Sequence, residues 1–161
     1  MSPRLVRAKR LLLAGVCVAL APALPAAAVG RPPIAGTDVI TGKQVALRQY
    51  GGKPVFVNVW GSWCYGCTQE APTLARFARA HRVEVAFIGI DTVDSKAGAR
   101  AFYRRFDTDY PSIWDPRGVL ASAWSRGAPT TLVFDRRHIL VRTIQGSASA
   151  AQLNAALKRV T

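Results

Sequence analysis

The chain alternates between short continuous apolar runs and segments in which apolar residues recur every three or four positions. The continuous runs are rich in β-branched and aromatic residues, and a run that is apolar at nearly every position is typical of a strand buried on both faces of its sheet. Two such runs, residues 55–60 and 83–90, are predicted to be buried strands, and residues 131–135 and 139–145 are predicted as two further strands. A small hairpin is predicted before them, where Ile40 and Val45 flank the turn at residues 41–43.

Segments of helical spacing separate the predicted strands. From Cys64 onward, Leu74, Phe77 and Ala78 recur at spacings of three and four with arginines between them. This pattern predicts an amphipathic helix, and Pro72 should kink it.

Three further helices are predicted later in the chain. The first begins at an N-cap formed by Asp94-Ser95 and runs to Phe106. A short helix covers residues 119–124, and Ser149 caps a final helix. The residues expected to face inward are Ala97, Ala101, Phe102 and Phe106 on the first of these helices and Leu153, Ala156 and Leu157 on the last.

The order of the elements predicts the fold class. Residues 110–118 should be extended and then turn, so the order after the hairpin is β-α-β-α-α-β-β-α. A helix that connects two strands directly gives a parallel pair, whereas the tight turn at residues 136–138 makes its two strands antiparallel. The sequence therefore predicts one α/β domain, with helices on both faces of a mixed sheet that has an antiparallel edge.

The first 28 residues have the pattern of a targeting segment. Residues 1–10 carry four cations and no anion, and the apolar stretch after them ends in Ala26-Ala27-Ala28, as in a signal peptide with a small-residue cleavage site. The same stretch is long enough to stay as a membrane anchor, at roughly 18–20 apolar residues. Lipidation at Cys17 is a third alternative. All three place the predicted domain, residues 29–161, outside the cytoplasm.

The charge balance is strongly basic. The whole chain has 22 Lys and Arg against 9 Asp and Glu. Because four of the cations lie in residues 1–28, the predicted domain keeps 18 cations against the same 9 acids. A basic surface can attract anionic lipid, nucleic acid or acidic protein. The cations are spread along the domain without a long run or a nucleic-acid-binding motif, so we expect no nucleic-acid partner.

Two of the three cysteines, Cys64 and Cys67, stand three positions apart in the stretch WGSWCYGCTQEAP. Disulfides persist outside the cytoplasm. However, a bridge that closes so short a loop removes little entropy from the unfolded chain and is a poor structural staple. The spacing therefore favours a reactive pair over a structural one.

The position of the pair, between a buried strand and the start of a helix, explains how it could react. Unpaired N–H groups and the helix dipole stabilise an anion there, and can lower a thiol pKa from about 8.5 into the range of about 3.5–7.5. We expect Cys64 to be the exposed nucleophile that forms a mixed disulfide, and the more buried Cys67 to resolve it. Trp63 offers an apolar ledge beside them.

The segment VFVNVWGSWCYGCTQEAP resembles the active-site segment of the thioredoxin-like family, in particular its extracytoplasmic TlpA/ResA/CcmG (DsbE) branch. The matching residues are Asn58, Trp60, Trp63, Cys64, Cys67, Glu70 and Pro72. A second segment, GAPTTLVFDRRHIL, resembles the family's strand that follows a cis-proline, here Pro129. The resemblance covers roughly residues 34–160 and implies a three-layer α/β/α sandwich with an N-terminal hairpin.

The resemblance also implies roles for individual residues. Cys64 and Cys67 would cycle between dithiol and disulfide without any other cofactor, and Ala128-Pro129-Thr130 would bind substrate and keep metal off the thiols. Glu70 would exchange protons with the thiols, although it could also be a first-turn acid that complements the helix dipole. Asn58 stands where thioredoxins have a buried acid, so we expect Glu70 to be the only carboxylate nearby.

The family's activity is thiol–disulfide exchange, and the direction stays open because Tyr65-Gly66 replaces the proline-containing pair that affects redox poise. Similarity to the cytochrome c maturation members implies a monomer that reduces protein disulfides, for instance in apocytochrome c, with electrons from a membrane thiol donor. One alternative is an oxidase that forms disulfides in exported proteins. Others are a copper-binding chaperone that would use His81 or His138, and a non-catalytic secreted interaction domain.

Overall fold

The computed structural model describes residues 31–161, so the predicted targeting segment lies outside the described residues. Within them, no helix combines the length and apolar character needed to cross a bilayer. The elements in chain order are β1 (Ala35–Thr37), β2 (Gln44–Ala46), η1 (Leu47–Tyr50), β3 (Val55–Trp60), α1 (Tyr65–Ala80), β4 (Ala86–Thr92), α2 (Lys96–Phe106), β5 (Ser112–Asp115), α3 (Val119–Trp124), β6 (Thr130–Phe134), β7 (Leu140–Gln145) and α4 (Ala150–Val160).

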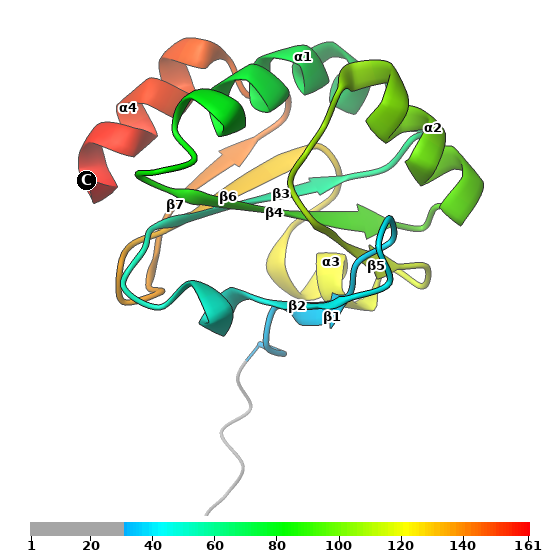
Figure 1. The fold of residues 1–161 in the computed structure, drawn as a ribbon, viewed down its shortest axis with the longest axis horizontal. Coiled ribbons are helices and arrows are strands. Elements are labelled where there is room, and N and C mark those ends of the chain that lie inside the picture. Colours follow the sequence, from blue (N-terminus) through cyan, green and yellow to red (C-terminus); the bar gives the residue numbers. More distant parts are fainter. Residues whose placement is uncertain (1–30) are drawn as a thin grey trace, which may run out of the picture.

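Five of the strands form one mixed sheet in the order β5-β4-β3-β6-β7. The β5, β4 and β3 strands are parallel, and β6 and β7 continue the sheet antiparallel. Helices α1, α2 and α4 cover one face, while α3 and the β1–β2 hairpin lie on the other (Figure 1). The predicted α/β class, with its mixed sheet, antiparallel edge and N-terminal hairpin, is confirmed.

Alternate residues of the central strand β3 pack into different layers. Phe56 packs with α1 and α4, whereas Val55, Val57 and Val59 pack with the hairpin and α3. Trp60, the last residue of β3, packs in a third cluster with both cysteines and with Ala99 and Tyr103 of α2. Burial on both sides explains why β3 is apolar at nearly every position.

Several predicted boundaries were wrong. Strand β5 was predicted only as an extended segment, because its four residues are flanked by proline and contain Ser112. Strand β4 begins at Ala86 rather than at Val83, which is exposed in the turn after α1. The α2 helix buries Ala99 and Tyr103, and leaves Ala97 and Ala101 exposed. The expected inner face was therefore rotated, since it was centred on Phe102 and Phe106.

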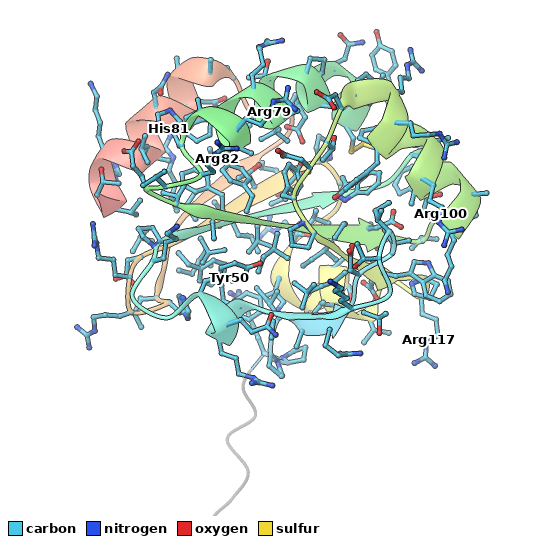
Figure 2. All side chains as sticks on the ribbon, in the orientation of Figure 1. Tyr50, Arg79, His81, Arg82, Arg100 and Arg117 are labelled. Carbon is cyan, nitrogen blue, oxygen red and sulfur yellow. A yellow bond between two sulfur atoms is a disulfide. The ribbon has the colours of Figure 1, made fainter. Side chains whose placement is uncertain are left out.

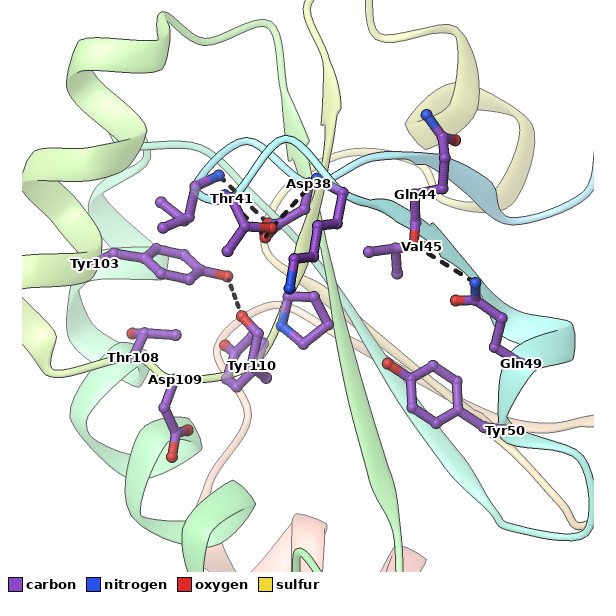
Figure 3. Close-up of a pocket in the computed structure, with 13 residues that line it drawn as sticks. Asp38, Thr41, Gln44, Val45, Gln49, Tyr50, Tyr103, Thr108, Asp109 and Tyr110 are labelled. Atoms are coloured by element: carbon purple, nitrogen blue, oxygen red, sulfur yellow. Dashed lines mark hydrogen bonds between the residues drawn. The ribbon is translucent and has the colours of Figure 1, made fainter.

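The N-terminal hairpin is joined to the sheet through Asp38. This buried carboxylate accepts hydrogen bonds from the N–H groups of Ile40 and Thr41 in its own loop and from the N–H of Ser112 on β5. The loop 38–43 is longer than the three-residue turn that the sequence predicted. Beside it lies a cavity of about 390 Å³, whose lining includes Tyr50, Tyr103 and Tyr110 but neither cysteine (Figure 3).

The outer surface is basic, as the composition predicts. Arg82, Arg100 and Arg117 extend from three different parts of the molecule (Figure 2). Among residues 31–161, Arg79 is the only Lys or Arg that forms an ion pair with a carboxylate, at 3.1 Å from Asp107. The cations are thus solvated and dispersed, which fits a role in solubility.

Candidate functional site

The cysteine pair lies where β3 ends and α1 begins. Cys64 is the N-cap of α1, and its sulfur accepts a hydrogen bond from the N–H of Cys67 at 3.1 Å. The two sulfurs form a disulfide with an S–S distance of 2.11 Å. An N-cap sulfur that accepts a backbone N–H is stabilised as a thiolate once the disulfide is reduced.

The pair is more deeply covered than the sequence predicted. Cys64 is 5 % exposed and Cys67 is 1 % exposed. Cys64 is thus the more accessible of the two, as expected, but its predicted exposure was wrong, because in the disulfide it packs with Trp60 and α2. A substrate sulfur can therefore reach the Cys64 sulfur only when the substrate contacts the surface around it.

The predicted substrate loop lies against the cysteine turn. The Ala128–Pro129 peptide bond is cis. A Cβ atom added to Gly66 would lie 3.1 Å from the Cγ of Pro129 and 3.1 Å from the Oγ of Ser147. The hydroxyl of Ser147 also donates to the Gly66 carbonyl at 2.9 Å. Glycine between the cysteines therefore allows this close approach, which a larger side chain would obstruct.

The three residues of the loop differ in what they offer a partner. The Pro129 carbonyl already accepts a hydrogen bond from the N–H of Gly146. Thr130 is fully buried, and β6 is paired on both sides at this residue. Within residues 31–161, the backbone N–H and C=O of half-buried Ala128 make no hydrogen bond. Ala128 is thus the loop residue whose backbone is free for an extended polypeptide.

Glu70 faces into the molecule one helical turn beyond Cys67, and is only 3 % exposed. Its Oε1 accepts from the side-chain amide of Asn58 at 2.8 Å, and its Oε2 accepts from the N–H of Ala148 at 2.6 Å. Burial raises the pKa of Glu70 to about 7, although the bonds from Ala148 and Asn58 act in the opposite direction. A carboxyl with this pKa can both accept and release a proton near neutrality.

A second buried carboxyl, which the sequence did not predict, lies at this end of the sheet. Asp91, the second-last residue of β4, lies in register with Trp60 and is fully buried, and neither of its oxygens has a hydrogen-bond partner among the described residues. Burial, followed by the neighbouring Asp94 and Asp115, raises its pKa to about 8. The available signal was its place at the end of a parallel strand, because such ends meet at one edge of the sheet.

Trp63 is 59 % exposed, and its indole N–H donates to the carbonyl of Thr92 at 3.1 Å. The predicted ledge beside the cysteines is therefore held against the loop that follows β4. That loop was not among the predicted site residues, although it contributes the exposed side chain of Val93, the residue after Thr92.

The histidines considered for copper lie elsewhere. His81 pairs with Glu84 at 3.0 Å, and the Nε2 of His138 lies 3.2 Å from the carbonyl of Tyr50. In the part of the chain that the structure describes, no three His, Cys, Asp or Glu side chains are grouped as metal ligands. The chemistry available at the site is that of the cysteine pair and its neighbouring acids.

Comparison with known proteins agrees with this geometry. Residues 31–143 match the model of the AhpC/TSA family. The chain belongs to the AhpC/TSA family. The thiol-disulfide oxidoreductase ResA of Bacillus thuringiensis is 27% identical over 132 residues, which cover 81% of this chain and 76% of ResA. The thiol:disulfide interchange protein DsbE of Xylella fastidiosa is 35% identical over 99 residues, which cover 60% of this chain and 49% of DsbE.

Among solved structures, a secreted thiol-disulfide isomerase from Corynebacterium glutamicum has a TM-score of 0.73 and 28% sequence identity, covering 80% of this chain and 84% of that one. The fold is thus thioredoxin-like, as the resemblance implied. With its disulfide-forming Cys64–Cys67 pair, this member of the family is a thiol–disulfide oxidoreductase of the ResA/DsbE type.

Proposed function

We propose that the chain reduces disulfides of proteins outside the cytoplasm, with Cys64 as the attacking thiolate. The place of Cys64 at the N-cap of α1, bonded to Cys67 in the oxidised state, supports disulfide exchange in either direction. There the thiolate needed for attack is stabilised, and the second sulfur is close enough to close the disulfide. The observation that carries the reducing direction is the apolar burial of both sulfurs.

The reaction balances in two exchanges. The Cys64 thiolate attacks a substrate disulfide, so that a bond forms between Cys64 and one substrate sulfur while the other substrate sulfur leaves as a thiolate and takes a proton. Glu70 then accepts the proton of Cys67, whose thiolate attacks the Cys64 sulfur. The Cys64–Cys67 disulfide forms and the second substrate thiolate leaves, takes up the proton and is released as a thiol. An external dithiol must reduce the enzyme again.

The surroundings of the pair support the reducing direction. One backbone N–H is directed at Cys64, and no Lys, Arg or His of the described residues donates to either cysteine sulfur. Apolar packing around the sulfurs and the nearby carboxyl of Glu70, when it is ionised, both disfavour a thiolate. Conditions that disfavour the thiolate favour the disulfide, and a dithiol that readily becomes a disulfide is a reductant.

One observation favours the opposite direction. The N–H of Cys67 stabilises the thiolate of Cys64, and a strongly stabilised thiolate is what makes a thioredoxin-like protein an oxidant. The second candidate is therefore an oxidase that forms disulfides in exported proteins.

The reduction potential decides between the two candidates. It would be measured by equilibrating the protein with glutathione or dithiothreitol buffers and quantifying free thiols. We expect a value below about −180 mV, the potential of protein disulfide isomerase, whereas a value near about −120 mV would indicate an oxidase.

Catalysis itself is tested by insulin reduction. The Cys64→Ser variant should lose the activity, and the double variant with Cys67→Ser should behave in the same way. Equal activity in Cys64→Ser and the wild type would contradict the proposal and favour a non-catalytic domain.

For the substrate and location we propose a disulfide in the haem-attachment motif of apocytochrome c, a membrane thiol donor and a monomeric enzyme. The support is the resemblance to the cytochrome c maturation branch and the targeting pattern of residues 1–28. A peptide with an oxidised Cys-x-x-Cys-His motif should be reduced faster than a peptide without the histidine. N-terminal sequencing of the exported protein would show whether the segment is cleaved.

A further inference from the structure

Large apolar side chains are exposed mainly at the end of the molecule that carries Cys64. Seven such side chains are exposed in residues 31–161, and four of them belong to segments at this end: Trp63, Tyr65, Val93 and Val119. Trp63 directly precedes Cys64, and its indole N–H bonds to the carbonyl of Thr92, next to Val93. We call Trp63 and Val93 the Trp63–Val93 patch. Both side chains are 59 % exposed.

Val93 has a backbone conformation that valine disfavours. Its φ is +50°, in the left-handed region, where a β-branched residue is an outlier. The other two residues with positive φ apart from glycine are Asp107 and His138, both of polar types that adopt this conformation more readily. Because the Val93 side chain is exposed, burial does not offset its backbone strain.

The strained conformation is fixed from both sides. The N–H of Val93 donates to the carbonyl of Asp115 at 3.0 Å. The next residue, Asp94, accepts hydrogen bonds from the N–H and the hydroxyl of Ser62, in the turn that leads to Cys64. A Cβ added to Gly118 would lie 3.0 Å from a methyl carbon of Val93. The loop thus holds the valine directly after Thr92, whose carbonyl bonds the Trp63 indole, at a cost that a glycine would avoid.

We propose that the Trp63–Val93 patch docks an apolar side chain of the substrate polypeptide beside the cysteine under attack. The proposal rests on the proposed function and names its substrate class: unfolded or partly folded polypeptides with apolar residues next to their cysteines. Since Cys64 is almost covered, a substrate sulfur reaches it only when the substrate contacts the surface around it. Trp63 and Val93 are apolar parts of that surface, and contact with an apolar side chain removes both from water.

The test compares two disulfide-linked peptides that differ in one position beside the cysteine, leucine in one and serine in the other. The wild type should reduce the leucine peptide with a KM about fivefold lower. Val93→Gly removes the side chain and suits the positive φ, so it should lose this preference while keeping or raising the melting temperature. Val93→Asn, polar and tolerant of the same φ, should behave in the same way. Oxidised glutathione should react equally with all three proteins.

Val83→Gly is the matched control. Val83 is also exposed, but it lies beyond the C-terminal end of α1, about 24 Å of helix away from Cys64. This variant should keep the fivefold preference. Retention of the preference in Val93→Gly would overturn the proposal, and so would an equal loss in Val83→Gly.

A binding measurement separates this proposal from the proposed function. The same peptides with serine in place of cysteine cannot react, so their affinity for the oxidised protein reports docking alone. We expect about fivefold tighter binding of the leucine peptide to the wild type and equal binding of both peptides to Val93→Gly. Equal binding of both to the wild type would refute docking even if reduction proceeds, whereas preferential binding without turnover would refute only the proposed function.

Discussion

Two buried carboxyls near the cysteine pair differ in their hydrogen bonds. Glu70, on α1, accepts one bond from Asn58 and one from Ala148. Asp91, the second-last residue of β4, accepts none from the described residues. Burial is the largest cause that raises the pKa of each, to about 7 for Glu70 and about 8 for Asp91.

The difference shows how the two acids can serve different purposes in similar surroundings. The donors to Glu70 stabilise its ionised form and keep its pKa near neutrality, where a carboxyl can exchange a proton in both directions. Asp91 lacks donors and lies near the charges of Asp94 and Asp115. In its neutral form it can instead donate a hydrogen bond to Asp94, which holds the turn before Cys64 through Ser62. With a pKa of about 8, Asp91 keeps most of its proton at pH 7.

The largest expected effect is on stability, in Asp91→Asn. Because its pKa is raised from 3.8 to about 8, folded Asp91 keeps a proton that the unfolded chain releases above pH 4. The free energy of unfolding of the wild type therefore falls as pH rises from about 4 to about 8, and then levels. Asparagine does not titrate and can donate to Asp94, so the variant should be about 3 kcal/mol more stable than the wild type at pH 8.5.

Urea unfolding at pH 5 and pH 8.5 measures this effect, and the gain should be smaller at pH 5. Asp109→Asn, at an exposed acid, is the control and should change stability at neither pH by more than about 0.5 kcal/mol. An Asp91→Asn variant that is less stable than the wild type at pH 8.5 would mean that Asp91 is ionised and paired in solution.

The next largest effect is on turnover, in Glu70→Gln. A glutamine oxygen can still accept the N–H of Ala148, so the fold should persist, but the amide cannot take the proton of Cys67. We expect turnover in insulin reduction to fall about 100-fold at pH 7, which corresponds to about 2.7 kcal/mol. The inflection near pH 7 in the pH–rate profile should disappear. Glu84→Gln, at an exposed acid after α1, should keep both the rate and the inflection.

The sequence predicts one of these acids and not the other, for a physical reason. Glu70 follows Cys67 by three residues on the same helix, so helical spacing alone brings it near the pair. Asp91 is 31 positions from Trp60 in the chain. It lies beside Trp60 only because β4 pairs with β3 in this register. Strand pairing of this kind is a tertiary property that local patterns do not specify.

The same distinction applies to the fold. Long runs such as β3 and the spacing of α1 follow directly from apolar periodicity. Strand β5, with four residues and a buried Ser112 that accepts from the Trp60 indole at 2.9 Å, has no local signal of its own. The inner face of α2 was mispredicted because Tyr103 turns inward and donates its hydroxyl to the carbonyl of Tyr110, while alanine carries little information about burial.

A smaller effect is expected in Asn58→Leu, which makes Glu70 more like Asp91. The Asn58 amide stabilises ionised Glu70 at 2.8 Å, and leucine has a similar volume without a donor. Loss of the bond should raise the pKa of Glu70 by about one unit, or about 1.4 kcal/mol. The inflection in the pH–rate profile should move from near pH 7 to near pH 8, and an unmoved inflection would assign it to another group.

The smallest effect is expected in Ser147→Ala. This variant tests whether the N–H of Ala148 can donate to Glu70 when the loop before α4 is no longer bonded to Gly66. The Ser147 hydroxyl donates to the Gly66 carbonyl at 2.9 Å, and the N–H of the next residue donates to Glu70. Because Ser147 is exposed, water can replace this bond, and the loss of stability should be only about 0.5–1 kcal/mol. Thermal unfolding measures this loss of stability, with Ser122→Ala on α3 as a control of similar exposure.

If Ser147→Ala also moves the inflection near pH 7, the pKa of Glu70 depends on the bond between Ser147 and Gly66. If the inflection stays, the Ala148 N–H still donates to Glu70 without the Ser147 bond. The difference between Glu70, which has donors, and Asp91, which has none, then does not depend on the attachment of this loop.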